Sequence, residues 1–335
     1  MLFTLMKYNI LGRTGLHISQ LGFGCGSIGG LLVRGDYPTM RRVVSCAIEL
    51  GINYFDTAPQ YGNGQSEVNL GAVLRELKAN VLIGTKVRLT GAEMGQIGAA
   101  ISRSVEGSLR RLGRATIDLI QLHNRIGFQG QPEQDQDRVG IHGLDAVLRA
   151  FEMLQQQGKI RFWGITGLGA SDGLHEAVAT GGFQVIQVPY NLLNPSAGTT
   201  VPPSFPFQDY GQLIDHAARE EMGVIAIRIL AGGALSGTTD RHPIAAQSVN
   251  PIASEQAYSA DVARVQRYTF LVEDGVVSNL VESAIRFVVS KSGVSTALLG
   301  ISSRDQLEQA VKYVERGPLS VDTLRHIRAT WSCPE

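Results

Sequence analysis

Short apolar runs alternate with amphipathic stretches along almost the whole chain of 335 residues. Short apolar runs bounded by turn residues are typical of buried strands, and the stretches between them have a helical period. Strands and helices in alternating order predict an α/β fold built on a parallel sheet. The eight expected strands are residues 21–24, 52–55, 81–85, 117–122, 160–164, 183–188, 223–229 and 295–299.

No linker separates these units, so we expect a single (β/α)8 TIM barrel domain over residues 1–335. Residues 8–12 and 16–19 flank Arg13-Thr14-Gly15 and predict a β-hairpin ahead of the barrel. The alternative fold is a doubly wound sheet, which would carry a glycine-rich dinucleotide fingerprint after an early strand. Residues 22–30 superficially offer one, but GxG patterns are weak signals. Asp56, at the end of the next strand, already belongs to the cluster described below.

Helices are expected between the strands, among them residues 39–50, with Thr39 as the N-cap and Gly51 as the stop. Residues 124–140, 191–207 and 231–256 have no clear period. Loops of such length in a compact domain are usually functional lids or disordered segments. Because they follow predicted strands, we expect them to shape any substrate pocket.

Four polar residues accompany the predicted strands: Asp56, Tyr61, Lys86 and His123. All but Tyr61 stand at or just after the carboxyl end of a strand, the edge where barrel enzymes have their active sites. A phenol titrates near pH 10, and a neighbouring ammonium lowers that pKa. A carboxylate keeps the lysine charged and oriented, and a histidine donates a hydrogen bond to a substrate oxygen. The cluster therefore predicts a tyrosine general acid/base acting on a carbonyl oxygen, as hydride transfer requires.

Each of these residues has an ordinary structural explanation when it is taken alone. A tyrosine in a Gly/Pro-rich turn is usually a surface aromatic, a lysine after a strand is usually solvated, and an aspartate there usually caps a turn. The four residues together, at strand ends and in this order, favour the catalytic interpretation.

Composition excludes several other classes of function. Lysine plus arginine and aspartate plus glutamate number 30 each, for a net charge of +0, and no basic run suggests nucleic acid or an anionic membrane as a partner. The three cysteines, Cys25, Cys46 and Cys333, are too far apart for a zinc motif or a disulfide framework, so we expect no metal and a reducing cytoplasm. The apolar start is too short for a signal peptide, and no segment is long enough to span a bilayer.

These residues resemble the aldo-keto reductase superfamily, and the resemblance extends from about Tyr8 to Leu319. It implies a barrel whose bottom is closed by the N-terminal hairpin, with a nicotinamide cofactor extended across the top. Tyr61 then corresponds to the proton donor, Lys86 and Asp56 to its tuning pair, and His123 to the residue that orients the substrate. The motifs that carry the resemblance are residues 51–58 with Tyr61-Gly62, Gly84-Thr85-Lys86, residues 118–123, residues 187–191, and Gln306-Leu307-Glu308.

The resemblance also implies a set of cofactor contacts. Gln187 corresponds to the glutamine that binds the carboxamide, and Asp56 is also among the expected contacts. The other expected contacts are Gly24 and Cys25, Thr166, Arg228, Leu230 and Gly232 at and beyond the end of the seventh strand, and Gly300, Ile301, Ser302, Arg304, Gln306 and Gln309 around the last strand and helix. The N-terminus of that helix favours an anion.

Three departures from the family pattern bear on the cofactor. Residues 164–168 read Gly-Ile-Thr-Gly-Leu in place of the usual Ser-Asn, which is similar to the sugar and pyridoxal dehydrogenase branch. Ile227 replaces the usual aromatic, and the following Arg228 either pairs with the pyrophosphate or is satisfied by a buried carboxylate. Arg304 is the one cation near the last strand, so the resemblance implies NADP(H) as the family default while NAD(H) fits these residues.

The leading hypothesis is an NAD(P)-dependent oxidoreductase acting on an aldehyde, ketone, alcohol or sugar. The alternative is a cofactor-binding regulatory subunit with little turnover. A third hypothesis, an isomerase or lyase on the same barrel, would need metal ligands or a site for a phosphate substrate.

Overall fold

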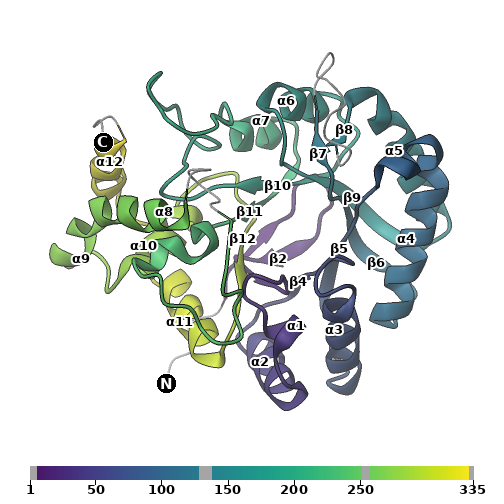
Figure 1. The fold of residues 1–335 in the computed structure, drawn as a ribbon, viewed down its shortest axis with the longest axis horizontal. Coiled ribbons are helices and arrows are strands. Elements are labelled where there is room, and N and C mark those ends of the chain that lie inside the picture. Colours follow the sequence, from purple (N-terminus) through teal and green to yellow (C-terminus); the bar gives the residue numbers. More distant parts are fainter. Residues whose placement is uncertain (1–5, 128–137, 251–256, 332–335) are drawn as a thin grey trace.

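In the computed structural model, eight parallel strands close into a barrel (Figure 1). The structure describes residues 6–127, 138–250 and 257–331. Neighbouring strands follow the order β10-β11-β12-β3-β4-β5-β6-β9 around the ring. This closed ring confirms the predicted (β/α)8 barrel and rules out the doubly wound sheet. The barrel strands are β3 (Leu21–Gly24), β4 (Tyr54–Asp56), β5 (Leu82–Val87), β6 (Ile117–Leu122), β9 (Ile160–Thr166), β10 (Val185–Pro189), β11 (Gly223–Ile227) and β12 (Thr296–Gly300).

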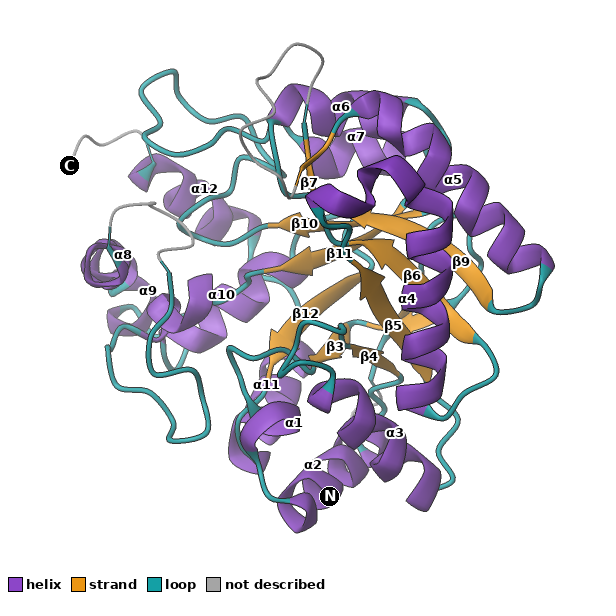
Figure 2. Ribbon diagram, turned by 45° about the vertical axis from the view of Figure 1, so that its right-hand side comes forward, coloured by secondary structure: helices purple, strands orange, loops and turns teal. Residues whose placement is uncertain are grey.

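Helices surround the barrel and bury their apolar stripes against the outside of the strands (Figure 2). They are α2 (Tyr37–Glu49), α3 (Gln65–Glu76), α4 (Ile97–Leu112), α5 (Ile141–Gln156), α6 (Ser171–Ala179), α7 (Leu213–Arg219), α10 (Leu280–Val289) and α11 (Arg304–Glu315). The prediction that Thr39 caps α2 is wrong. The N-cap is Asp36, whose carboxylate accepts from the backbone N–H of Thr39 at 2.8 Å, because Pro38 already fits the first turn.

A helix was expected to resume near Ala260, and α8 (Tyr258–Val265) confirms it. Other elements were not predicted, because they are short or too polar to show a clear period. They are α1 (Leu31–Arg34), η1 (Gly91–Gln96), η2 (Ala231–Ser236), η3 (Gln266–Tyr268), α9 (Phe270–Glu273) and α12 (Val321–Thr330). In the segment expected as loop 124–140, β7 (Arg125–Ile126) pairs with β8 (Arg138–Val139). The rest of that loop, 128–137, lies outside the described residues, as do 251–256 of the third expected loop.

The predicted hairpin consists of β1 (Tyr8–Ile10) and β2 (His17–Ser19), paired antiparallel. It closes the amino-terminal end of the barrel: the Asn9 side chain donates to the carbonyl of Ser295, just before β12, at 2.9 Å. Leu11, in the turn, is fully buried. It fills the lower end of the barrel together with apolar side chains that face inward from several strands, namely Tyr54, Leu119, Val185 and Ile225.

The inside of the barrel changes from apolar to polar toward the carboxyl ends of the strands. Because side chains on a strand alternate between faces, Asp56 points inward one step above Tyr54. Lys86 on β5, Gln121 on β6 and Gln187 on β10 are also buried, and each hydrogen bonds to Asp56. This polar layer is the floor of the candidate site.

Candidate active site

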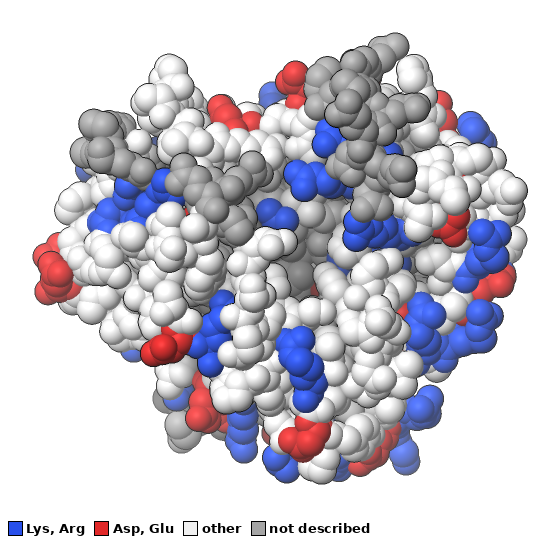
Figure 3. Space-filling model, viewed as in Figure 1, with Lys and Arg blue, Asp and Glu red and all other residues white. Residues whose placement is uncertain are grey.

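A cavity of about 690 Å³ opens at the carboxyl end of the barrel. Asp56, Tyr61 and His123 line one part of it, and Gln306 and Tyr313 line a distant part. The space-filling view shows a hollow near the centre of this face with Lys and Arg side chains around it (Figure 3). Sites for cofactors and drug-sized ligands typically have volumes of about 300–1,000 Å³, so the cavity has the size of a ligand site.

Asp56 and Lys86 form an ion pair in the polar layer, and both side chains are at most 2% exposed. The Lys86 ammonium donates to Oδ1 of Asp56 and to the carbonyl of Thr57, the latter at 2.8 Å. Burial disfavours the charged lysine, but Asp56 and Tyr61 outweigh burial and raise the pKa of Lys86 above its ordinary value. The lysine therefore stays charged at the floor of the cavity.

Tyr61 lies in the turn between β4 and α3, where its backbone N–H donates to the carbonyl of Ala58 at 3.1 Å. The Lys86 ammonium lies 4.9 Å from the centre of the Tyr61 ring and hydrogen bonds to its hydroxyl. The net pKa shift is opposite to the predicted one: burial raises the pKa of Tyr61, Lys86 lowers it, and Asp56 raises it again. The result is a phenol that keeps its proton at neutral pH.

His123 follows β6 and meets Tyr61 edge-to-face, with 6.0 Å between the ring centres. Burial, with the charges of Lys86 and Arg88, lowers the pKa of His123 to about 3, so the ring is neutral. Its Nδ1 lies 3.2 Å from Oε1 of Gln60, which can only accept a hydrogen bond. This contact favours the tautomer with the proton on Nδ1 and leaves Nε2 as an acceptor, whereas the sequence analysis predicted a donor. Gln60, next to Tyr61 in the same turn, was not singled out there.

The second oxygen of Asp56 is surrounded by three neutral donors. Oδ2 accepts from Nε2 of Gln187 at 2.7 Å, from the hydroxyl of Tyr54 at 3.0 Å and from Nε2 of Gln121 at 3.2 Å. Tyr54 and Gln121 were missed by the sequence analysis. The available signal was spacing, because residues two apart along a strand point to the same face. Tyr54 stands two residues before Asp56, and Gln121 stands two residues before His123.

The structure places most of the expected cofactor residues along the cavity. The lining includes Gly24, Asp56, Thr166, Gln187, Arg228, Leu230, Gly232, Gly300, Ser302, Gln306 and Gln309. Cys25 and Ile301 are buried beside lining residues and do not line the cavity themselves. Arg304 is 61% exposed and binds Glu308 at 2.8 Å, so its guanidinium is held on the surface of α11.

Two observations fit an extended ligand in this cavity. The hydroxyl of Thr166 is buried and has no hydrogen-bond partner among the described residues, although its residue lines the cavity. Buried polar groups normally have partners, so a partner from a ligand fits here. A Cβ added at Gly26 would stand 3.6 Å from the Tyr61 ring, so the absence of a side chain keeps space open beside the phenol. The carboxamide and backbone contacts expected for a nicotinamide cofactor suit these positions.

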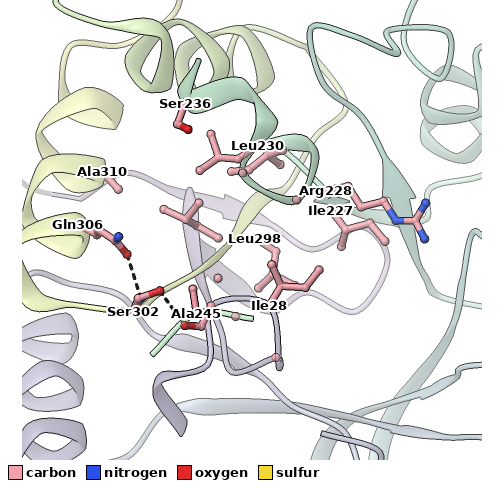
Figure 4. Close-up of a pocket in the computed structure, with 18 of the residues that line it drawn as sticks. Ile28, Ile227, Arg228, Leu230, Ser236, Ala245, Leu298, Ser302, Gln306 and Ala310 are labelled. Atoms are coloured by element: carbon pink, nitrogen blue, oxygen red, sulfur yellow. Dashed lines mark hydrogen bonds between the residues drawn. The ribbon is translucent and has the colours of Figure 1, made fainter. Parts of the chain in front are cut away.

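Figure 4 shows the long axis of the cavity, with Ile227 and Arg228 at one end and Gln306 and Ala310 at the other. Arg228 adopts a positive φ of 57°, and the Asn191 side chain donates to its carbonyl at 3.1 Å. At the far end, the backbone N–H of Ser302 donates to Oε1 of Gln306 at 3.0 Å. The backbone of Arg228 at one end and the side chain of Gln306 at the other are thus held by neighbours, and Asn191, which the sequence analysis named only as part of a motif, is a supporting residue.

Within the described ranges, no group of three or more His, Cys, Asp or Glu side chains is arranged to hold a metal ion. Over the same ranges, none of the helices has the length and apolar character needed to cross a membrane.

Comparison with known proteins identifies relatives over almost the full length. L-galactose dehydrogenase of Arabidopsis thaliana is 27% identical over 97% of this chain and 94% of that protein. Pyridoxal 4-dehydrogenase of Microbacterium luteolum is 25% identical over 91% and 92%. A probable voltage-gated potassium channel subunit beta of A. thaliana is 24% identical over 94% and 93%. Enzymes and a channel subunit therefore share this sequence pattern.

Among solved structures, the chain resembles the holo form of aldo-keto reductase AKR11C1 from Bacillus halodurans, with a TM-score of 0.69 and 28% identity over 97% of this chain and 96% of that one. The model of the aldo/keto reductase family matches residues 20–332. With this match across nearly the whole chain, and with a closed barrel that carries the polar cluster at its carboxyl end, the protein belongs to the aldo/keto reductase family.

Proposed function

We propose that this protein transfers hydride between a nicotinamide cofactor and a carbonyl or alcohol group, with Tyr61 as the general acid/base. The observation that carries the proposal is the buried Asp56–Lys86 pair beneath the Tyr61 phenol, at the floor of a ligand-sized cavity. The family is one of oxidoreductases, and the holo form of a structural relative supports cofactor binding. When bound, the nicotinamide supplies or accepts the hydride.

The residues of the chain then control the proton. Because Tyr61 keeps its proton at neutral pH, it donates to the oxygen of a carbonyl that is being reduced. Lys86, which hydrogen bonds to the phenol oxygen, stabilises the phenolate that remains. In the oxidative direction the phenolate has to accept a proton, so oxidation should rise with pH and reduction should be favoured at lower pH.

The neutral His123 supports a hydroxylated substrate. With Nδ1 facing Gln60, Nε2 is free to accept a hydrogen bond from a hydroxyl beside the reacting carbon. Aldoses and other hydroxy-carbonyl compounds offer such a group. We therefore place sugars ahead of simple aldehydes and ketones, and the similarity to L-galactose dehydrogenase supports that order.

Three features of α11 favour NAD(H) over NADP(H). Arg304 is engaged by Glu308 on the outer surface. Gln306 is neutral and its Oε1 accepts from the backbone N–H of Ser302, so this side chain provides no cation for a 2′-phosphate. Asp305, in the first turn of α11, lines the cavity, where its carboxylate would repel a 2′-phosphate and can accept from ribose hydroxyls.

The similarity to a probable channel beta subunit supports the alternative, a regulatory subunit with little turnover. The arrangement of the cluster nevertheless favours turnover, because Asp56, Tyr61 and His123 line one part of the cavity and the buried Lys86 pairs with Asp56.

Hydride transfer is tested with NADH deuterated at C4. We expect deuterium to appear on the carbon of a reduced aldose or hydroxy-aldehyde, since the hydride passes directly from the cofactor. Product analysis by mass spectrometry, with the unlabelled cofactor as the control, measures it. Tight binding of NADH and NADPH without transfer to any member of a sugar and carbonyl panel would favour the regulatory alternative.

Replacing Asp305 tests the choice of cofactor. We expect Asp305→Asn to improve the NADP/NAD affinity ratio about tenfold, because one repulsive charge beside the 2′-phosphate is worth roughly 1.4 kcal/mol. Calorimetric titration of both cofactors measures the ratio. Asp322→Asn, on the exposed surface of α12, is the matched control. An unchanged ratio in Asp305→Asn would remove Asp305 from the account of cofactor choice.

A further inference from the structure

The Asp56 carboxylate accepts more hydrogen bonds than an ion pair with Lys86 requires. Lys86 donates to Oδ1, while Oδ2 accepts from Tyr54, Gln121 and Gln187. All of these side chains are at most 2% exposed. Gln187 also lines the cavity, whereas Tyr54 and Gln121 lie below it and have no place among its lining residues. Their side chains therefore reach the site only through Asp56.

Tyr54 is built into the barrel in a way that directs its hydroxyl at Asp56. Its ring belongs to the apolar layer at the lower end, packed with Leu11 and Leu119, while its hydroxyl reaches the polar layer above. Space for the hydroxyl comes from Gly84 on β5, where an added Cβ would stand 2.2 Å from the phenol oxygen. Packing alone would be satisfied by a phenylalanine at this position, so the hydroxyl serves the carboxylate.

Gln121, on β6, gives a second argument that these hydrogen bonds serve Asp56. Its Nε2 donates to Asp56, but its Oε1 is buried and has no partner among the described residues. A buried acceptor without a partner destabilises the fold, so stability alone does not explain this side chain. The retained amide is explained if its hydrogen bond to Asp56 serves the reaction.

We propose that Tyr54 and Gln121 are positioning residues that hold Oδ2 of Asp56, so that Oδ1 stays directed at Lys86 beneath Tyr61. The inference rests on the proposed function, because it concerns how the same proton donor is tuned. The titratable groups that face Asp56 are Cys25 after β3, Tyr54 on β4, Tyr61 after β4 and Lys86 on β5. Burial and the Asp56 charge raise the pKa of the Tyr54 hydroxyl well above its ordinary value, so it donates throughout the working pH range.

Removing one neutral donor leaves more of the Asp56 charge unscreened. Asp56 raises the pKa of Tyr61, so a less screened carboxylate raises it further and makes the phenolate harder to form. A carboxylate held by fewer donors also rotates more freely, which misplaces Lys86. Both effects weaken the proton step, and neither Tyr54 nor Gln121 lines the cavity where the cofactor would lie.

The first test is Tyr54→Phe, which keeps the ring and removes the hydroxyl. We expect kcat to fall roughly tenfold, with KM for the cofactor within about twofold of the wild-type value. The rise of alcohol oxidation with pH should move upward by about half a pH unit. Tyr268→Phe is the matched control, since the Tyr268 hydroxyl is also buried and donates to a backbone carbonyl, that of Leu192, away from the cavity. We expect the control to keep the wild-type pH profile.

The second variant, Gln121→Met, separates tuning from folding. It removes a donor to Asp56 and an orphaned acceptor together, so thermal stability should be unchanged or higher while kcat falls about threefold or more. This variant also keeps the inference testable if Tyr54→Phe fails to fold. Wild-type kcat and a wild-type pH profile in a folded Tyr54→Phe or Gln121→Met would overturn it. If instead the wild-type protein transfers no hydride to any substrate, the proposed function fails. That outcome differs from one in which the wild-type protein is active and both variants have wild-type kcat and pH profile, which overturns only the further inference.

Discussion

Tyr61→Phe should reduce the rate of carbonyl reduction about a thousandfold, within the range that a positioned general acid contributes. The variant loses the one hydroxyl that Lys86 hydrogen bonds at the floor of the cavity, while the ring keeps its edge-to-face contact with His123. Cofactor affinity should remain within about twofold, because the phenol acts on the substrate oxygen and not on the dinucleotide. Steady-state kinetics and a binding titration together measure the two quantities.

The pH dependence gives the Tyr61→Phe experiment a second readout. Burial raises the pKa of Tyr61, so the wild-type phenol is fully protonated at neutral pH and the oxidation rate should climb as the pH rises toward that pKa. In Tyr61→Phe the residual oxidation rate should lose this climb. Tyr268→Phe again serves as the control. A Tyr61→Phe enzyme with wild-type turnover would disprove the proposed mechanism.

The barrel could be predicted because its signal is local. Each strand is a short apolar run, and the turn residues between strands and helices mark the boundaries. The predicted seventh strand nevertheless extended to 229, two residues beyond the end of β11. The reason is Arg228, whose positive φ ends the strand and is supported by the Asn191 side chain from 37 residues away. Contacts across such distances leave no local pattern.

In the candidate site, too, features with a local sequence signal were predicted and contacts between distant residues were not. Asp56, Lys86 and His123 were identified because strand ends are readable from sequence. Gln187 was predicted as a cofactor contact, but its hydrogen bond to Asp56 was not predicted, and Gln121 was missed altogether. Gln121 is 65 residues and Gln187 is 131 residues from Asp56, so neither contact leaves a local pattern. The predicted lowering of the Tyr61 pKa included the ammonium of Lys86 but omitted burial, which depends on how all eight strands pack. The net electrostatics of a buried cluster requires the folded geometry.

Lys86→Met should destabilise the protein by about 3–5 kcal/mol, because it leaves the Asp56 charge buried without a cation. Lys86 and Asp56 are 1% and 2% exposed, so water cannot replace the lost partner. The three neutral donors on Oδ2 remain and limit the loss. Urea-induced unfolding, followed by circular dichroism, measures the free energy of unfolding. Turnover should fall together with stability, since the Tyr61 phenolate loses its stabilising ammonium.

The double variant Asp56→Asn/Lys86→Met distinguishes a structural from a catalytic need for the pair. Replacing both charges of a buried ion pair is often close to neutral for stability, because no isolated charge remains. We therefore expect the double variant to recover most of the stability that Lys86→Met loses, yet to stay as inactive as the single variant. Recovery of activity along with stability would mean that the pair serves folding only. Recovery of stability alone would show that the barrel tolerates an uncharged core and that the charges are kept for the proton held by Tyr61.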